Sequence, residues 1–258
     1  MFKKIRIVIL LLILTIVGGR TFFSRVWSTD WDIPLGVIVY PVNGDGSAAA
    51  ARYISSLERD TFEPVADYFV KQAKQHDLPL SEPITIDLTE EVSSLPPQAP
   101  FGGSRLAIML WSLKMRWWAW RVDKYDGPGN IKAFVLYFDT DAHKELDHSL
   151  GLEKGMVCMV NAFASRNLAA RNNVIIAHEL LHTLGATDKY DPQTSQPIFP
   201  EGYANPERQP RYPQQKAEIM GGLIPVSETT SDWPQMLRDT VIGPVSAREI
   251  GWITMSDD

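Results

Sequence analysis

The sequence contains two histidines whose spacing suits a shared metal ion, in the segment His178-Glu179-Leu180-Leu181-His182. This segment lies in an apolar pattern typical of a buried helix. Residues four apart on a helix project from the same face, so His178 and His182 can ligate one ion. Glu179 is rotated away from that face and can instead reach a metal-bound water as a general base. The pattern therefore predicts a bound Zn²⁺ ion and hydrolysis by a metal-activated water.

A catalytic zinc ion usually has three protein ligands and one open position. The other histidines of the chain do not continue the pattern: His76, His143 and His148. Asp188 does continue it, because Gly185 allows the chain to turn sharply off the helix after His182. We therefore expect Asp188 to be the third ligand. An alternative takes a glutamate further along the chain, with three available: Glu201, Glu207 and Glu218.

This extended pattern resembles the metzincin clan of metallopeptidases, whose motif is His-Glu-x-x-His-x-x-Gly-x-x-His, with aspartate last in some branches. The tail from Gly185 to Asp191 is most similar to the immune-inhibitor-A and snapalysin-like branches. The resemblance implies a methionine in a tight turn beneath the metal, and Met220 in the segment 218–222 matches it. Residues 246–252 resemble the carboxy-terminal helix of those branches, so the resemblance extends over roughly residues 171 to 252.

The resemblance implies a zinc metallopeptidase, a metalloendopeptidase acting on peptide or protein substrates. A loop of about thirty residues with many prolines follows Asp188, and we interpret it as a wall of the substrate cleft. Tyr190 on this loop can hydrogen-bond an oxyanion, and Tyr203 and Tyr212 are alternatives. Packing of these rings against the loop is the other interpretation. Asp188 and Asp191 also form a weak candidate for calcium binding.

Two other functions are compatible with the same residues. The first is an extracytoplasmic zinc-binding protein with a structural or binding role, although such a site has no need of Glu179 as a base. The second is a zinc hydrolase of non-peptide substrates. The metal chemistry alone does not separate these functions from peptide hydrolysis.

The amino terminus reads as a segment for export. Residues 1–6 are basic and residues 7–17 are almost wholly aliphatic, which is typical of a signal peptide or an amino-terminal membrane anchor over residues 1–26. Either interpretation places the remaining chain outside the cytoplasm, as a secreted, periplasmic or anchored protein. If the segment is not cleaved, it also makes the membrane a partner.

Composition indicates one globular domain over residues 27–258, and we expect a monomer. The chain has 258 residues, 45% of them hydrophobic, and a formal net charge of −6, which excludes the basic surface that nucleic-acid binding needs. The single cysteine, Cys158, excludes an intramolecular disulfide and lies in an apolar run typical of a buried strand.

Apolar runs alternate with helical patterns along the first two thirds of the chain. Strands are expected near residues 35–40, 84–88, 131–139 and 156–161, and helices near 48–76, 104–122 and 171–186. The helical pattern over 48–76 should break or kink into two pieces at Pro64. The order predicts an α+β fold, a metzincin-like catalytic domain. It would have a mixed twisted sheet, an active-site helix over 171–186 and a loop-rich carboxy-terminal subdomain over 187–258 that carries the methionine turn.

The expected helix over residues 104–122 has two apolar faces. One is a stripe at helical spacing, which we expect to pack on the sheet: Leu106, Leu110, Leu113, Trp117 and Trp120. The second carries Trp111 and Trp118 among cationic residues. Tryptophan next to cations suits contact with lipid headgroups, so this second face is a candidate membrane surface.

Overall fold

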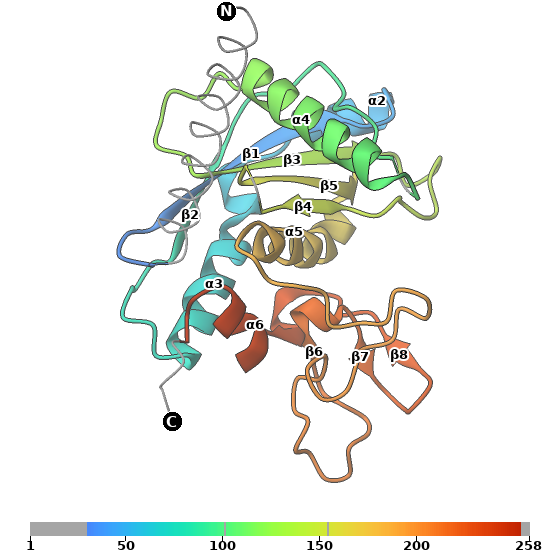
Figure 1. Ribbon diagram of the computed structural model, residues 1–258. Helices are drawn as coiled ribbons and strands as arrows, with labels where there is room; N and C mark the ends of the chain where they lie inside the picture. Colours follow the sequence, from blue (N-terminus) through green and yellow to red (C-terminus); the bar gives the residue numbers. More distant parts are fainter. Residues whose placement is uncertain (1–29, 101, 154, 254–258) are drawn as a thin grey trace, which may run out of the picture.

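The computed structural model describes residues 30–100, 102–153 and 155–253, which form an α+β fold with a mixed sheet (Figure 1). The predicted signal peptide or anchor over residues 1–26 lies outside this range. Among the described residues, no helix combines the length and the apolar character that crossing a membrane requires.

The described chain contains nine strands and five α-helices. The strands are β1 (Leu35–Asn43), β2 (Ile84–Leu88), β3 (Ile131–Phe138), β4 (Leu150–Leu152), β5 (Val157–Phe163), β6 (Ala217–Glu218), β7 (Ile224–Pro225), β8 (Ser231–Asp232) and β9 (Thr240–Val241). The helices are α2 (Ala48–Ile54), α3 (Glu63–Gln75), α4 (Arg105–Val122), α5 (Ala169–Thr183) and α6 (Pro244–Glu249). Single 3₁₀ turns lie at η1 (Arg59–Thr61), η2 (Arg166–Leu168), η3 (Ile219–Gly221) and η4 (Leu237–Asp239).

The main sheet has five strands in the order β2-β1-β3-β5-β4. Strands β2, β1, β3 and β5 are parallel to their neighbours, whereas β4 pairs antiparallel with β5 at the edge. Strands β1, β3 and β5 are nearly continuous runs of buried apolar residues, because helices cover both faces of the sheet. Strand β4 is short and only partly buried.

The two faces of the sheet belong to two separate hydrophobic clusters. Val37 and Val39 point into the larger cluster, which also contains the apolar sides of α2, α3 and α5. Ile38 and Tyr40 point to the opposite face, where α4 packs. The larger cluster continues through residues 219–252, so the carboxy-terminal part shares its core with the sheet and α5. Figure 1 shows α4 on one side of the sheet and α5 on the other.

The predictions for both faces of α4 are wrong, because the stripe expected in the core is exposed and the face with Trp111 and Trp118, considered as a membrane surface, is buried. The stripe expected to pack on the sheet is exposed, with Trp120 at 71%, whereas Trp111, Met115 and Trp118 are buried. The indole nitrogens of Trp111 and Trp118 donate to Pro97 O (2.8 Å) and Ser94 Oγ (3.1 Å) in the preceding loop. Both faces of α4 are apolar, so periodicity did not discriminate between them. The buried face is the one whose indole N–H groups find acceptors.

Other boundaries differ by smaller amounts. The helical region predicted over residues 48–76 is divided into α2, η1 and α3, which confirms the expected break near Pro64. Pro64 lies in the first turn of α3, where its missing N–H costs nothing. The predicted active-site helix over 171–186 spans Ala169–Thr183 instead. It ends earlier because Gly185 takes a positive φ of 106°, which turns the chain away from the helix axis. Cys158 is a buried free thiol, as expected.

Candidate metal centre

Helix α5 holds its two histidines on a rigid support. Apolar residues along the helix pack against the sheet, and Asn172 is buried at its start. The Asn172 side chain donates to Phe163 O (2.9 Å) and accepts from Phe163 N (3.2 Å) at the end of β5. These paired bonds fix the position of α5 along the sheet, and therefore also the position of His178 and His182.

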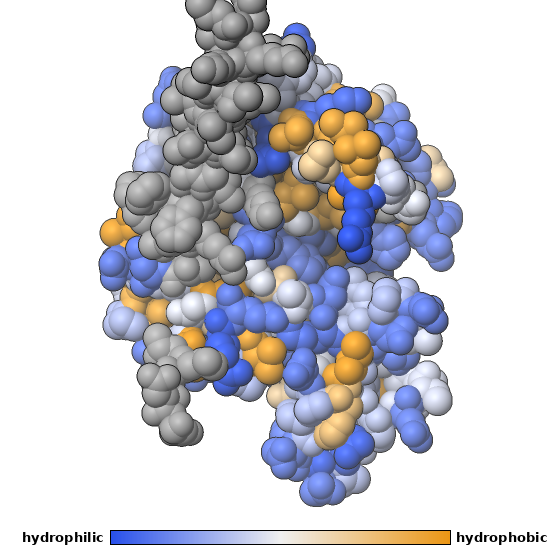
Figure 2. Space-filling view, in the orientation of Figure 1, coloured by the Kyte–Doolittle hydropathy of each residue, from blue (hydrophilic) through white to orange (hydrophobic). Residues whose placement is uncertain are grey.

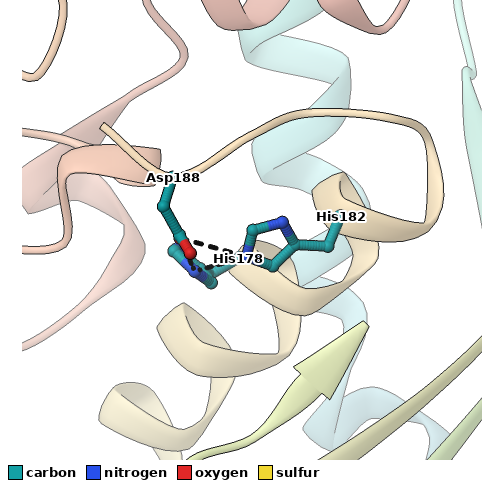
Figure 3. A group of neighbouring side chains, drawn as sticks. All are labelled: His178, His182 and Asp188. Carbon is teal, nitrogen blue, oxygen red and sulfur yellow. Dashed lines mark hydrogen bonds and ion pairs between the residues drawn. The ribbon is translucent and has the colours of Figure 1, made fainter. Parts of the chain in front are cut away.

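The structure brings the three predicted ligands together (Figure 3). The Nε2 atoms of His178 and His182 lie 3.1 Å apart, and Asp188 Oδ1 lies 3.3 Å from the first and 3.1 Å from the second. Two ligand atoms on a tetrahedral zinc ion at about 2.1 Å would be about 3.4 Å apart. The observed triangle is slightly tighter, so these three residues could hold a zinc ion after a small expansion.

Backbone carbonyls set the orientation of both imidazoles. Nδ1 of His178 lies 2.9 Å from Ile219 O, and Nδ1 of His182 lies 2.8 Å from Ala186 O. A carbonyl oxygen only accepts, so each Nδ1 carries a proton when it makes this bond. In the neutral ring, Nε2 then presents its lone pair to the shared point, as metal-ligating histidines do.

Without a metal, the Asp188 carboxylate pairs with the imidazoles of both His178 and His182. Burial alone would lower the pKa of His178, but the hydrogen bond to Asp188 and the charge of Glu179 raise it to about 9. Burial opposes ionisation of Asp188, yet hydrogen bonds with both imidazoles hold its pKa well below its usual range. A metal ion therefore has to displace a proton from this site, so its apparent affinity falls as the pH falls.

The segment that carries Asp188 is held in place by a buried ion pair. Lys189 Nζ lies 2.7 Å from Glu249 Oε2 and also donates to Thr187 O (2.7 Å), with only 3% of the lysine side chain exposed. Glu249 in turn accepts from the backbone N (3.0 Å) and the hydroxyl (2.7 Å) of Thr187. On the other side, Lys189 N donates to Met220 O (2.8 Å). Asp188 thus lies between two anchored neighbours.

We expect Glu249→Ala to destabilise the metal-free protein by about 3 kcal/mol or more, because it leaves the Lys189 ammonium buried without its partner. Zinc affinity should also fall, since the segment around Asp188 loses its anchor. Urea denaturation and a competitive zinc titration measure the two effects. The control is Lys189→Met combined with Glu249→Leu, which should recover most of the stability. Unchanged stability of Glu249→Ala would contradict the proposed role of the ion pair.

Glu179 is a buried carboxylate beside the histidines. Only 5% of the residue is exposed, and Oε2 has no hydrogen-bond partner among the described residues. Burial raises the pKa of Glu179, and the charges of His178 and His182 offset part of this effect. A buried acceptor without a protein partner is costly. Next to the three candidate ligands, this oxygen could accept a hydrogen bond from a water molecule on a bound metal. The residues present therefore fit a hydrolytic metal site.

Strand β4 approaches α5 so closely that a side chain at Gly151 would not fit. A β-carbon there would overlap Cβ of His182 and lie 2.8 Å from the Glu179 carbonyl oxygen. The same β-carbon would lie 3.4 Å from Glu179 Oε2. Gly151 therefore allows the edge strand to pass directly beside the metal ligands and the buried carboxylate.

We expect Gly151→Val to lower any metal-dependent activity by roughly 100-fold, because β4 must move away and a displacement of about 1 Å is enough for such a loss. Leu150→Val, in the same strand, keeps the path of the backbone and serves as the control. Steady-state rates with each variant at saturating metal test this effect. Equal rates for wild type and Gly151→Val would show that the close approach is unimportant.

Met220 and Tyr190 lie beside the site. Met220 is fully buried in η3, directly after Ile219, whose carbonyl binds His178. Tyr190 is half-buried next to Asp188. Burial, together with the charge of Asp188 and a hydrogen bond to it, raises the pKa of Tyr190 to about 12, so its hydroxyl stays protonated near neutral pH.

The remaining sequence candidates do not belong to the candidate ligand group. The group formed by His178, His182 and Asp188 is the one set of three that could hold a metal among residues 30–100, 102–153 and 155–253. The alternatives outside it are Glu201, Glu207, Glu218, Asp191, His76, His143 and His148. The hydroxyls of Tyr203 and Tyr212 instead hydrogen-bond to each other at 2.9 Å.

Glu218 has a different role from the ligand role considered for it. It is fully buried and accepts from Gly221 N (2.9 Å), Gly243 N (2.9 Å) and the Ser246 hydroxyl (2.8 Å). Burial raises its pKa, while these hydrogen bonds act in the opposite direction. Glu218 therefore ties the turn around Met220 to the start of α6. The sequence signal for this role was a lone acidic residue inside an otherwise apolar turn.

Comparisons with known proteins found matches among solved structures. No family model matches the chain, and no curated protein matches it. Among solved structures, crystal structures of wild-type OgpA from Akkermansia muciniphila in two crystal forms match with 12% and 14% sequence identity and a TM-score of 0.38 each. Each match covers 86% of this chain and 62% of the OgpA chain, so this chain spans less than two thirds of the OgpA length. The similarity is too low to transfer a property from OgpA.

Proposed function

We propose that this chain is a zinc metallopeptidase of the metzincin type, a metalloendopeptidase with Glu179 as its general base. The observation that carries the proposal is the triangle of His178, His182 and Asp188 donor atoms beside the buried Glu179 carboxylate, whose Oε2 has no hydrogen-bond partner among the described residues. Two imidazoles and one carboxylate can also hold Fe²⁺. The Glu179 carboxylate favours hydrolysis, because activation of a water molecule needs a base at this position.

Each residue has a definite task in this mechanism. Bound Zn²⁺ would polarise the scissile carbonyl and lower the pKa of its water ligand. Glu179 accepts the proton of the attacking water and passes it to the leaving amine. Its raised pKa makes Glu179 a stronger base than an ordinary glutamate, which favours acceptance of the proton from the attacking water. The protonated Tyr190 hydroxyl next to Asp188 can donate to the oxyanion.

Strand β4 supports a peptide as the substrate. It is the edge strand of the sheet, and Gly151 at its centre lies against α5 at the metal ligands. An extended peptide that pairs with the outer edge of β4 would place its backbone beside these ligands. Binding through backbone hydrogen bonds suits cleavage inside a chain, and the proline-rich loop after Asp188 remains our prediction for the opposite wall.

The rest of the proposal concerns the setting of this activity. We propose that residues 27–258 form a single monomeric catalytic domain, with Met220 as the methionine turn beneath the metal. The hydrophobic cluster that joins the sheet, α5 and residues 219–252 supports one domain. The export signal over residues 1–26 places this domain outside the cytoplasm, secreted, periplasmic or anchored at the membrane.

Digestion of a peptide library by the purified protein tests the function. We expect cleavage at internal bonds, loss of cleavage with a zinc chelator, and recovery when zinc is restored. Bound zinc without cleavage of any peptide would instead support a structural or binding role. Cleavage of esters or amides, but of no peptide, would support a zinc hydrolase of another substrate class.

A further inference from the structure

Helix α4 presents an apolar face that none of the described residues covers. Seven large side chains on or beside this face are exposed, from the first turn of the helix to its last: Leu106, Ile108, Met109, Leu110, Leu113, Trp117 and Trp120. Figure 2 shows hydrophobic residues gathered over α4, with strongly hydrophilic residues beside them. A contiguous apolar surface of this kind on a globular domain marks a contact with another molecule or with a membrane.

The charged side chains of α4 itself all have the same sign. Arg105, Lys114 and Arg121 are exposed, and α4 contains no acidic residue, although the whole chain has a formal net charge of −6. None of these three cations forms an ion pair with another residue of the described chain. Arg121 lies over the ring of Trp117, with its guanidinium carbon 5.6 Å from the ring centroid. The cations are therefore available to an anionic partner.

We propose that this α4 face binds the surface of an anionic lipid bilayer, with the helix axis parallel to the membrane plane. Leucine, methionine and tryptophan on one side, with lysine and arginine along its borders, match an interfacial helix. Tryptophan favours the headgroup level, and the cations bind anionic lipids. Without this patch, an acidic domain would be repelled by an anionic membrane. The combination of charge and apolar area favours lipid over a second protein.

The position of α4 makes this contact compatible with an open metal site. Its buried side, Trp111, Met115 and Trp118, packs on one face of the sheet. Helix α5 and its histidines lie on the opposite face. A bilayer bound to α4 would therefore leave the metal ligands accessible. The proposal is independent of the proposed enzymatic function, because it uses no residue of the metal site.

A fluorescent probe on α4 tests the contact in the full chain. Cys158 is buried and will not react, so Leu113→Cys can be labelled selectively with an environment-sensitive dye. Ile198→Cys is the matched control, because Ile198 lies outside α4 and both side chains are 49% exposed. The labelled chains are reconstituted into vesicles that contain nitroxide-labelled lipid, with and without 30% phosphatidylglycerol as the anionic lipid. Circular dichroism of each variant shows that it is folded.

We expect the probe at 113 to be quenched by the nitroxide lipid at least threefold more than the probe at 198. The difference should grow with phosphatidylglycerol and shrink at high salt. Combining Arg105→Gln, Lys114→Gln and Arg121→Gln should remove the dependence on anionic lipid, while the apolar face stays unchanged.

Three results would overturn the proposal. Equal quenching at both positions would show that α4 has no special contact with lipid. A probe at 113 that is shielded in detergent, without lipid and at every protein concentration, would show that another part of the same chain covers the face. Shielding that depends on protein concentration would assign the face to a second copy.

Discussion

Glu179→Gln is expected to lower the rate of peptide hydrolysis by roughly 10³- to 10⁴-fold, at the upper end of what a general base contributes. Glutamine has nearly the same shape, but its amide cannot accept the proton of the attacking water. The zinc content should stay at one ion per chain, because His178, His182 and Asp188 remain. Activity against a peptide substrate and metal analysis on the same sample measure both quantities.

The stability of this variant gives a second readout. Glu179 is buried and its Oε2 has no partner among the described residues, so ionisation of this group is unfavourable in the folded protein. Removing the charge should leave the free energy of unfolding unchanged or raise it. The control is Glu201→Gln, the same substitution at an exposed residue outside the ligand group. If Glu179→Gln cleaves peptides as fast as the wild type, Glu179 is not the base.

His182→Ala is expected to abolish near-stoichiometric zinc binding, and with it the activity. The variant leaves one imidazole and one carboxylate on the ion. Loss of a direct ligand should weaken binding by more than the about 10- to 100-fold that loss of an outer hydrogen-bonding partner causes. Elemental analysis after dialysis measures the bound metal. Retained zinc would mean that other residues bind it.

Thermal unfolding extends the test of His182. Zinc that binds only the folded wild type, at about a thousand times its Kd, adds about 4 kcal/mol to the free energy of unfolding. His182→Ala should lose this gain, so added zinc should leave its Tm unchanged. His143→Ala is the matched control, because His143 lies outside the ligand group and its variant should respond to zinc like the wild type.

The sequence by itself determined the features of the site that depend on local geometry. His178 and His182 lie one helical turn apart, so any helix through them places both rings on one face. Gly185 follows closely, and its positive φ was expected from its position after the last helical turn. Asp188 follows His182 by six residues, so the short connecting segment has few conformations and keeps the carboxylate near the two histidines. The strand that contains Cys158 was also predictable, because a continuous apolar run is typical of a strand buried on both faces.

Only the tertiary structure decided which distant residues support this site. Gly151 lies in the short segment 150–152, which has no distinguishing pattern, yet its missing side chain allows β4 to pass beside His182. Glu249 lies far along the chain and fixes the segment of Asp188 through Lys189. Contacts between residues far apart in sequence depend on how the elements pack, and residue spacing does not encode that packing.

Helix α4 shows the same limit most directly. Its periodicity correctly predicted a helix, but both faces are apolar, and the stripe predicted to be buried is the exposed one. In the folded chain, the face with Trp111 and Trp118 is buried, and the indole N–H groups of both residues donate to acceptors in the preceding loop. The other face, with Trp117 and Trp120, was left exposed. A hydrophobic pattern predicts that apolar side chains avoid water. The packing of the elements determines whether these side chains are buried in the protein core or stay on the surface, where a membrane can cover them.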